Sequence, residues 1–287
     1  MKDKGQRLPS WLVKKTVPGA QVHQMKALLR QARLHTVCES ARCPNLGECF
    51  SKDTATFLIM GNICTRGCGF CAVDKGTPQA LDPDEPLQVA QVSHKLELRH
   101  VVITSVTRDD LPDGGAAHFT ATIQAVRELL PEALVEILTP DFGGDLKAIT
   151  QIAKAAPDIF NHNLETVPQL YSRVRSQADY RRSLEVLAQI KSLNPQIRTK
   201  SGLMLGLGET KDQVEQVMLD LHRMACDLLV IGQYLRPTLK NLEVERYLTP
   251  QEFEEYRELG LKLGFRQVMS QPLARSSYHA GEVAQMG

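Results

Sequence analysis

The residues of this 287-residue chain most able to do chemistry are its cysteines. Six of the seven lie between residues 38 and 71, and Cys226 stands alone far downstream. The six form two triplets with different spacings, C-x4-C-x5-C at Cys38, Cys43 and Cys49, and C-x3-C-x2-C at Cys64, Cys68 and Cys71. Clustering of this kind points to disulfides, to structural zinc or to iron–sulfur clusters.

Iron–sulfur clusters fit two triplets better than the other two chemistries do. Disulfides staple small secreted domains, whereas this chain is long enough to bury a core and opens with charged and polar residues instead of a signal peptide. Structural zinc takes four ligands, and no histidine lies at finger spacing beside either triplet. A cubane cluster takes one ligand per iron, so three cysteines leave one iron open. Two triplets therefore favour two clusters, each with an open coordination position.

Three motifs carry a resemblance to a known family. The C-x3-C-x2-C motif with an aromatic residue before its last cysteine (Phe70–Cys71) resembles the signature of radical S-adenosylmethionine (SAM) enzymes. The preceding CESARCPNLGECF resembles the auxiliary-cluster motif of the lipoyl synthase family, and RSSYHA, Arg275 to Ala280, resembles its closing motif. The motifs occur in the order of that family and cover the chain from end to end.

The resemblance implies an enzyme that inserts two sulfur atoms into an octanoyl chain attached to a lysine of a carrier protein. The implied carriers are the glycine cleavage H protein and the lipoyl domains of 2-oxoacid dehydrogenases, and an electron donor is also implied. One electron would cleave SAM to methionine and a 5′-deoxyadenosyl radical. Because the cofactor carries this step, no side chain is expected to act as a catalytic acid or base.

The resemblance also implies which residues hold two [4Fe-4S] clusters. Cys64, Cys68 and Cys71 would hold the cluster whose open iron chelates SAM. The second cluster, the sulfur donor, would have a serine of the closing motif as its fourth ligand, which we assign to Ser277 with Ser276 as the alternative. Its other ligands would be the first triplet, Cys38, Cys43 and Cys49.

Hydrophobic patterns predict the elements that must position these residues. Buried strands are expected at residues 56–60, 101–105, 134–138, 158–163, 199–205 and 228–233, with a further short strand in 265–270. Helices are expected at residues 86–98, 116–130, 144–156, 179–193 and 211–224. This alternation indicates right-handed βαβ units and a parallel sheet. We predict an α/β fold, a partial (β/α)6 parallel barrel of the radical SAM type with N-terminal and C-terminal extensions; a doubly wound sheet is the alternative.

The chain is expected to divide into three parts. Residues 1–53 form an extension that carries the first triplet, residues 54–264 form the barrel, and residues 265–287 close over the site. Within the extension we expect an arm at residues 1–21 anchored by Trp11, with its lysines in solvent, then a helix at 22–36 and a turn at 44–47. Capping boxes at Thr210 and Thr249 predict two helix starts.

Polar residues follow the ends of the predicted strands, where parallel α/β folds collect their chemistry. By resemblance to radical SAM enzymes, Asn163, Glu165 and Lys200 are predicted to bind the amino, carboxylate and ribose groups of SAM. The residues alone are equally consistent with a satisfied polar cluster, or with a pair between Glu165 and Lys200. Three aspartates follow the second strand and fit either turns or function: Asp109, Asp110 and Asp113.

Composition narrows the choice of partners. The net charge of +1 and the pI of about 7.6 give no basic field for nucleic acid, and no apolar run approaches the roughly 18 residues of a membrane span. We expect a cytoplasmic protein. Two rival functions remain: a sulfur-inserting methylthiotransferase, which would need an RNA- or protein-binding appendage, and an iron–sulfur carrier or redox sensor, which would not need polar strand ends.

Overall fold

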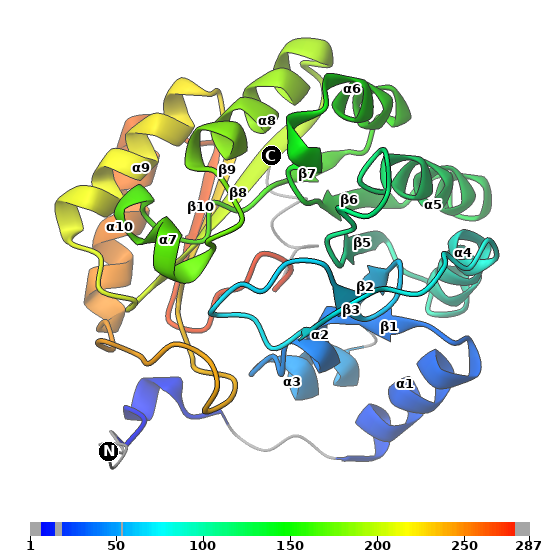
Figure 1. The fold of residues 1–287 in the computed structure, drawn as a ribbon. Coiled ribbons are helices and arrows are strands. Elements are labelled where there is room, and N and C mark those ends of the chain that lie inside the picture. Colours follow the sequence, from blue (N-terminus) through cyan, green and yellow to red (C-terminus); the bar gives the residue numbers. More distant parts are fainter. Residues whose placement is uncertain (1–6, 15–18, 53, 279–287) are drawn as a thin grey trace.

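An eight-stranded sheet forms the centre of the computed structural model, which describes residues 7–14, 19–52 and 54–278 (Figure 1). The strand order is β1-β2-β5-β6-β7-β8-β9-β10. In chain order these strands are β1 His35–Thr36, β2 Thr56–Ile59, β5 His100–Ser105, β6 Leu134–Leu138, β7 Ile159–Asn161, β8 Arg198–Leu205, β9 Leu228–Gln233 and β10 Gln267–Ser270.

Every pairing from β2 to β10 is parallel, and each strand lies beside the next one along the chain. A doubly wound sheet reverses its strand order at a switch point, so that alternative is excluded. The sheet instead curves into an open barrel, with β1 antiparallel on the edge of β2. All six predicted strands are present, β10 is the further strand expected after residue 265, and the predicted fold class is confirmed.

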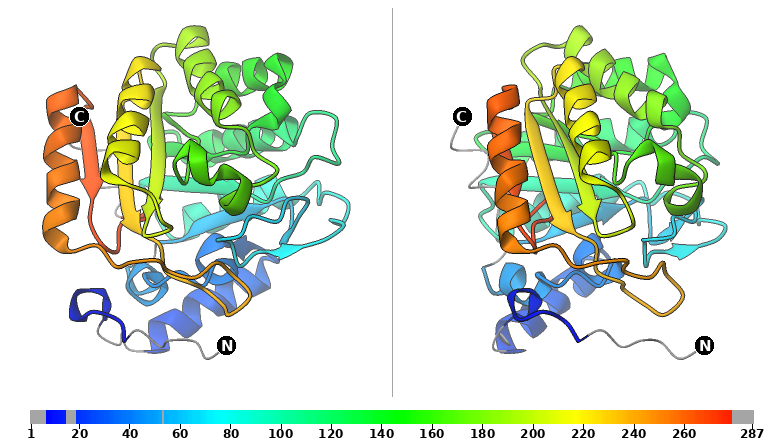
Figure 2. Two further views of the ribbon diagram at one scale, coloured as in Figure 1. Left: turned by 60° about the vertical axis from the view of Figure 1, so that its left-hand side comes forward. Right: turned by 90° about the vertical axis from the view of Figure 1, so that its left-hand side faces the viewer.

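Helices cover the outer face of this sheet (Figures 1 and 2). They begin where the sequence supplies caps, because a side-chain oxygen satisfies an otherwise free backbone N–H. Both predicted capping boxes form, Thr210 with Gln213 and Thr249 with Glu252. The covering helices are α4 Glu85–Lys95, α5 Ala116–Leu129, α6 Leu146–Ala155, α8 Tyr180–Leu193, α9 Lys211–Arg223 and α10 Pro250–Leu263. Among the described residues, no helix is long and apolar enough to cross a bilayer.

The N-terminal extension is more helical than the sequence indicated. Helix α1, Gly19–Gln31, ends before residue 36, because Arg33 adopts a left-handed conformation with φ 55° and Leu34 N–H returns to the carbonyl of Leu29. Residues 35 and 36 then form β1. The expected turn at 44–47 is present at 44–45 alone, since helix α3, Leu46–Ser51, begins directly afterwards. Cys38 lies in another short helix, α2 Val37–Ser40.

The N-terminal arm is anchored as predicted. The indole N–H of Trp11 donates to the carbonyl oxygen of Leu248 at 3.1 Å, and Leu12 of the short helix η1, Ser10–Leu12, is buried. Lys14 was expected in solvent, but its ammonium pairs with Glu48 at 2.6 Å. Residues 1–6 and 15–18 of the predicted arm lie outside the described residues.

The capping box of α10 provides a test of the helix that supports the last strand. Thr249→Ala removes the hydroxyl that accepts from Glu252 N–H and is expected to lower the free energy of unfolding by about 1 kcal/mol. Thr150→Ala is the matched control, because the hydroxyl of Thr150 bonds within α6 to the carbonyl of Leu146 and alanine is the better helix former. Urea denaturation followed by circular dichroism measures both. Equal stability of the two variants would contradict the capping role.

Candidate functional site

The second cysteine triplet lies in the loop that follows β2, at the C-terminal end of the strands. Cys64 belongs to β3, Ile63–Cys64, which pairs with β4, Asp74–Lys75. Backbone N–H groups point at the sulfurs: those of Arg66 and Thr107 donate to Cys64 Sγ at 3.4 and 3.3 Å, and that of Val73 donates to Cys71 Sγ at 3.4 Å. Burial raises the pKa of Cys71 to about 12, and the neighbouring thiols Cys68 and Cys64 add to the rise. The triplet therefore converges.

Charged and amide side chains from other loops fix the conformation of this cysteine loop. Arg66 donates to Asp109 through Nε and Nη2, both at 2.8 Å, and through Nη2 to the fully buried Asp141 at 2.7 Å. Gln177 accepts from the N–H of Gly67, and Asn241 Nδ2 donates to the carbonyl of Cys71, both at 2.8 Å. Loops after four different strands, β5, β6, β7 and β9, thus hold the backbone between the second-triplet cysteines.

The three aspartates after β5 were expected either to form turns or to serve the site, and they do not all have the same role. Asp109 braces the cysteine loop, as described above. Asp113 accepts from the N–H groups of Gly115 and Ala117 at the start of α5, which is a turn and capping role. Asp110 pairs with Arg108, two residues earlier in the sequence.

Of the residues predicted to bind SAM, the structure brings Asn163 and Glu165 together and directs Lys200 elsewhere. Asn163 Nδ2 donates to Glu165 Oε1 at 3.0 Å. Glu165 has a positive φ of 64°, and burial raises its pKa while Arg175 opposes that rise. Lys200 donates to Glu136 Oε1 at 2.8 Å and to the carbonyl of Ser276 at 2.5 Å. In the structure, Lys200 is therefore paired with Glu136 and not with Glu165.

Arg175 was not found by sequence reasoning. It follows α7, Tyr171–Val174, and Nη1 donates to the carbonyls of Asn163 and Leu164 at 2.8 and 3.1 Å. Burial would lower the pKa of Arg175, but Tyr171, Glu165 and Cys68 raise it above its ordinary value. A guanidinium charge therefore faces the second triplet. No spacing pattern links this arginine to the cysteines, so the sequence alone carries no signal for it.

The first triplet gathers around the two short helices. Cys38 is buried in α2, and Cys49 lies in α3. Cys43 lies between them in the sequence, and its backbone N–H donates to the carbonyl of Cys38. Burial raises the pKa of Cys38 to about 12 and that of Cys49 to about 11, and the thiol of Cys43 adds to both shifts. Three mutually close thiols form a second donor set.

The described part of the closing motif, Arg275 to Tyr278, contacts both ends of the site; residues 279 and 280 lie outside the described residues. Ser276 donates from Oγ to Asn163 Oδ1 at 3.0 Å, and Tyr278 donates to Glu48 of α3 at 2.9 Å. Burial lowers the pKa of Arg275, and Cys43 and Glu165 oppose that shift. Glu165 in turn raises the pKa of Cys68 and Cys71, so Arg275 and Glu165 both act electrostatically on the site.

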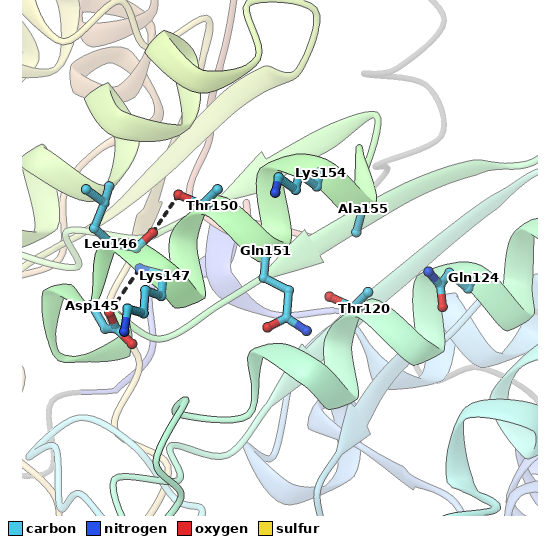
Figure 3. A pocket seen from close by; sticks show the side chains of 9 residues that line it. All are labelled: Thr120, Gln124, Asp145, Leu146, Lys147, Thr150, Gln151, Lys154 and Ala155. Atoms are coloured by element: carbon cyan, nitrogen blue, oxygen red, sulfur yellow. Dashed lines mark hydrogen bonds between the residues drawn. The ribbon is translucent and has the colours of Figure 1, made fainter.

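A single-metal site and a surface hollow are the other candidates for a functional site among the described residues. Within residues 7–14, 19–52 and 54–278, no three His, Cys, Asp or Glu side chains are close enough to hold a single metal ion. A hollow of about 760 Å³ lies between α5 and α6, lined by residues that include Thr120, Gln124 and Lys154 (Figure 3). It contains none of the predicted site residues, and Asp145 and Thr150 in its wall bond within their own helix.

Comparison with solved structures supports the fold. The chain superimposes on methylornithine synthase with a TM-score of 0.58 over 92% of this chain and 86% of the other, at 15% identity. A maturase of the [FeFe]-hydrogenase gives the same score over 92% of this chain and 70% of its own, at 12% identity. Identities this low carry the fold alone.

Comparison with known sequences supports a narrower assignment. A family model of the radical SAM superfamily matches residues 58–221, and one for the N-terminal domain of lipoyl synthase matches residues 1–43. The lipoyl synthase of Caldanaerobacter subterraneus is 57% identical over 96% of this chain and 96% of its own length. That of Nitrosococcus oceani is 55% identical over 97% of this chain and 86% of its own. With both cysteine triplets and the closing motif gathered at one end of the barrel, the chain belongs to the lipoyl synthase family of radical SAM enzymes.

Proposed function

We propose that this chain, a radical SAM enzyme of lipoyl cofactor synthesis, inserts two sulfur atoms into the octanoyl chain of an octanoyl-lysyl carrier protein, with sulfur from an auxiliary cluster. One observation carries the proposal: the closing motif contacts both sides of the site, because Ser276 donates to Asn163 and Tyr278 donates to Glu48 of α3. The first donor set and the second are thus joined by one short segment. This proximity suits a reaction that makes a radical at one set and takes sulfur from the other.

Both donor sets fit an iron–sulfur cluster. Each is a set of three thiols, which leaves one iron of a cubane for another ligand. The N–H groups aimed at Cys64 and Cys71 are donors of the kind that stabilise cluster and thiolate sulfur. We therefore propose two [4Fe-4S] clusters, one on Cys64, Cys68 and Cys71 and one on the first triplet.

We propose that Asn163 and Glu165 contact SAM beside the second triplet. When bound there, the cluster and SAM supply the 5′-deoxyadenosyl radical. The chain keeps a carboxylate and an amide fixed against each other at 3.0 Å, and the Arg175 guanidinium balances the negative charge of Glu165 and of the thiolates. The contact of Lys200 with SAM stays a prediction, because its ammonium is engaged by Glu136 and Ser276.

We assign the fourth ligand of the auxiliary cluster to Ser277. The neighbouring serine, Ser276, already donates its hydroxyl proton to Asn163, which supports Ser277 over Ser276. An alkoxide is a hard ligand on a site otherwise built from soft thiolates. Such a poorly matched ligand suits a cluster that gives up its sulfur. Arg275 beside Cys43 supplies positive charge against that cluster.

The partners and the location are part of the same proposal. The carriers are the glycine cleavage H protein and the lipoyl domains of 2-oxoacid dehydrogenases, and a separate reductant supplies the electron. We place the protein in the cytoplasm. Residues 1–53, 54–264 and 265–287 act as the auxiliary-cluster extension, the barrel and the closing segment.

A matched pair of cysteine variants tests the division of labour between the triplets. The protein is reconstituted anaerobically with iron and sulfide, reduced, and given SAM and an octanoyl-lysine peptide. The native chain is expected to give 5′-deoxyadenosine and a peptide carrying two sulfurs. Cys38→Ala should keep SAM cleavage and lose sulfur insertion, whereas Cys68→Ala should lose both. Cys226→Ala is the control, because this buried thiol contacts only backbone oxygens among its described hydrogen bonds.

Two other outcomes of the SAM cleavage and sulfur insertion assay would change the proposed function. Deoxyadenosine without sulfur insertion by the native chain would keep the radical chemistry and refute this substrate, which favours a methylthiotransferase. Confirmed clusters without any SAM cleavage would favour the iron–sulfur carrier or sensor.

A second pair of variants tests the serine ligand. In a Cys64→Ala, Cys68→Ala, Cys71→Ala background, Mössbauer spectra report the auxiliary cluster alone. Ser277→Ala should change the spectrum of one iron in four and lower cluster retention about tenfold, as loss of a ligand does. Ser276→Ala should leave the spectrum unchanged, and Ser277→Cys should restore retention. A spectrum altered by Ser276→Ala alone would assign the ligand to Ser276.

A further inference from the structure

The barrel interior contains a buried ion pair between Lys200 and Glu136, and the proposed function gives no role to Glu136. Lys200 of β8 and Glu136 of β6 are 1% and 0% exposed, with Nζ and Oε1 2.8 Å apart. Asn161 Nδ2 lies 3.5 Å from the same oxygen, and His100 Nε2 lies 3.3 Å from the other. Burial would raise the pKa of Glu136, but Lys200 and His100 bring it below its ordinary value. Lys200 and His100 thus favour the carboxylate form of Glu136 within the protein interior.

A buried ion pair is no more stabilising than well-packed apolar side chains, since desolvation offsets its attraction. Its value lies in the geometry that it imposes. An ammonium has three donors and no acceptor. One donor of Lys200 is held by Glu136, and another is aimed at the carbonyl of Ser276 at 2.5 Å. The pair thus presents a fixed positive donor to the backbone of the closing motif.

Two glycines, Gly202 and Gly232, allow the closing motif to approach the sheet beside Lys200. Alternate residues of a strand share a face, and the register places Lys200 and Gly202 of β8 on the same face as Gly232 of β9. A Cβ on Gly232 would lie 2.2 Å from the carbonyl oxygen of Ala274, and one on Gly202 would lie 3.0 Å from Ser276 Oγ. The segment after β10 therefore packs directly on the sheet backbone.

Backbone hydrogen bonds guide the same segment along β9 before it turns inward. Gln271 N–H donates to the carbonyl of Ile231, and Gln233 N–H donates to the carbonyl of Pro272 at 3.0 Å. In Figure 1 this segment, red, runs from the end of β10 toward the middle of the barrel. The sheet and the ion pair together fix where residues 274–276 lie.

We infer that Lys200, held by Glu136, docks the closing motif inside the open barrel and so sets which serine faces which cysteine triplet. With the Ser276 carbonyl fixed, its hydroxyl meets Asn163 on the SAM side, and Ser277 is left for the auxiliary cluster. Lys200 and Glu136 are positioning residues for sulfur insertion. The inference rests on the proposed function in one respect, the assignment of Ser277 to that cluster.

The test uses two variants that loosen the docking by different means. Lys200→Met with Glu136→Gln removes both charges and leaves no buried carboxylate unpaired. Gly232→Ala keeps both charges and places a methyl group against Ala274. Lys191→Met is the control. The ammonium of Lys191 lies 2.6 Å from the carboxylate of Asp227, and this pair is outside the closing motif. Each full-length protein is reconstituted, and its hydrogen exchange is followed by mass spectrometry.

Both docking variants are expected to speed amide exchange in peptides covering residues 271–278 by about tenfold, as for a locally opened segment, while Lys191→Met leaves them unchanged. Gly232→Ala should also lower the sulfur inserted per SAM cleaved by about tenfold. It also covers the case in which the double variant does not fold. Unchanged exchange in Gly232→Ala and in the folded double variant would overturn the inference.

SAM affinity separates docking from the rival role of Lys200. If Lys200 contacts SAM, the double variant weakens SAM binding in equilibrium dialysis without faster exchange at residues 271–278, and the inference is overturned. Faster exchange in both variants, in a protein whose native form makes no two-sulfur product, upholds the docking and refutes the proposed function instead.

Discussion

The consecutive parallel pairing of β2 through β10 is the constraint on which the rest of the molecule depends. Parallel strands joined by outer helices bring every strand end to one rim, so the second cysteine triplet after β2 lies near Glu165 and Arg175, which follow β7. Because the pairing stops at β10 instead of returning to β2, the barrel keeps an open side. Through that opening the last described residues reach Lys200 on β8. A closed barrel of the same strands would have its interior filled by side chains and no space for this segment.

Buried thiols define the electrostatic problem that the site has to solve. Burial raises the pKa of Cys38 and Cys71 to about 12, so in the metal-free chain these thiols keep their protons, and metal binding must release them. Positive charge near the sulfurs lowers that cost. Arg175 faces the second triplet and Arg275 faces Cys43. Both arginines are anchored through backbone carbonyls, which leaves part of each guanidinium charge uncompensated by carboxylates.

Sequence reasoning found what repeats or clusters along the chain and missed what only the fold brings together. The strands, the capping boxes at Thr210 and Thr249 and the six clustered cysteines all have local patterns. The early end of α1 depends on one residue, Arg33, in a left-handed conformation that its type does not favour. The Lys200–Glu136 pair joins residues 64 positions apart, and a single sequence contains no spacing rule for such a pair. The role of Lys200 could therefore not be read before the strand register was known.

The contacts that hold the closing motif differ in how deeply they are buried. In the inner contact the Lys200 and Glu136 side chains are buried, and the hydrogen bond from Lys200 to the carbonyl of Ser276 is part-buried. The outer contact joins Lys14, Glu48 and Tyr278, with Lys14 and Glu48 side chains 24% and 28% exposed. Water therefore reaches the outer ion pair more readily than it reaches the Lys200–Glu136 pair. The closing motif is therefore held at two points, inside the barrel by Lys200 and beside the first triplet by Glu48.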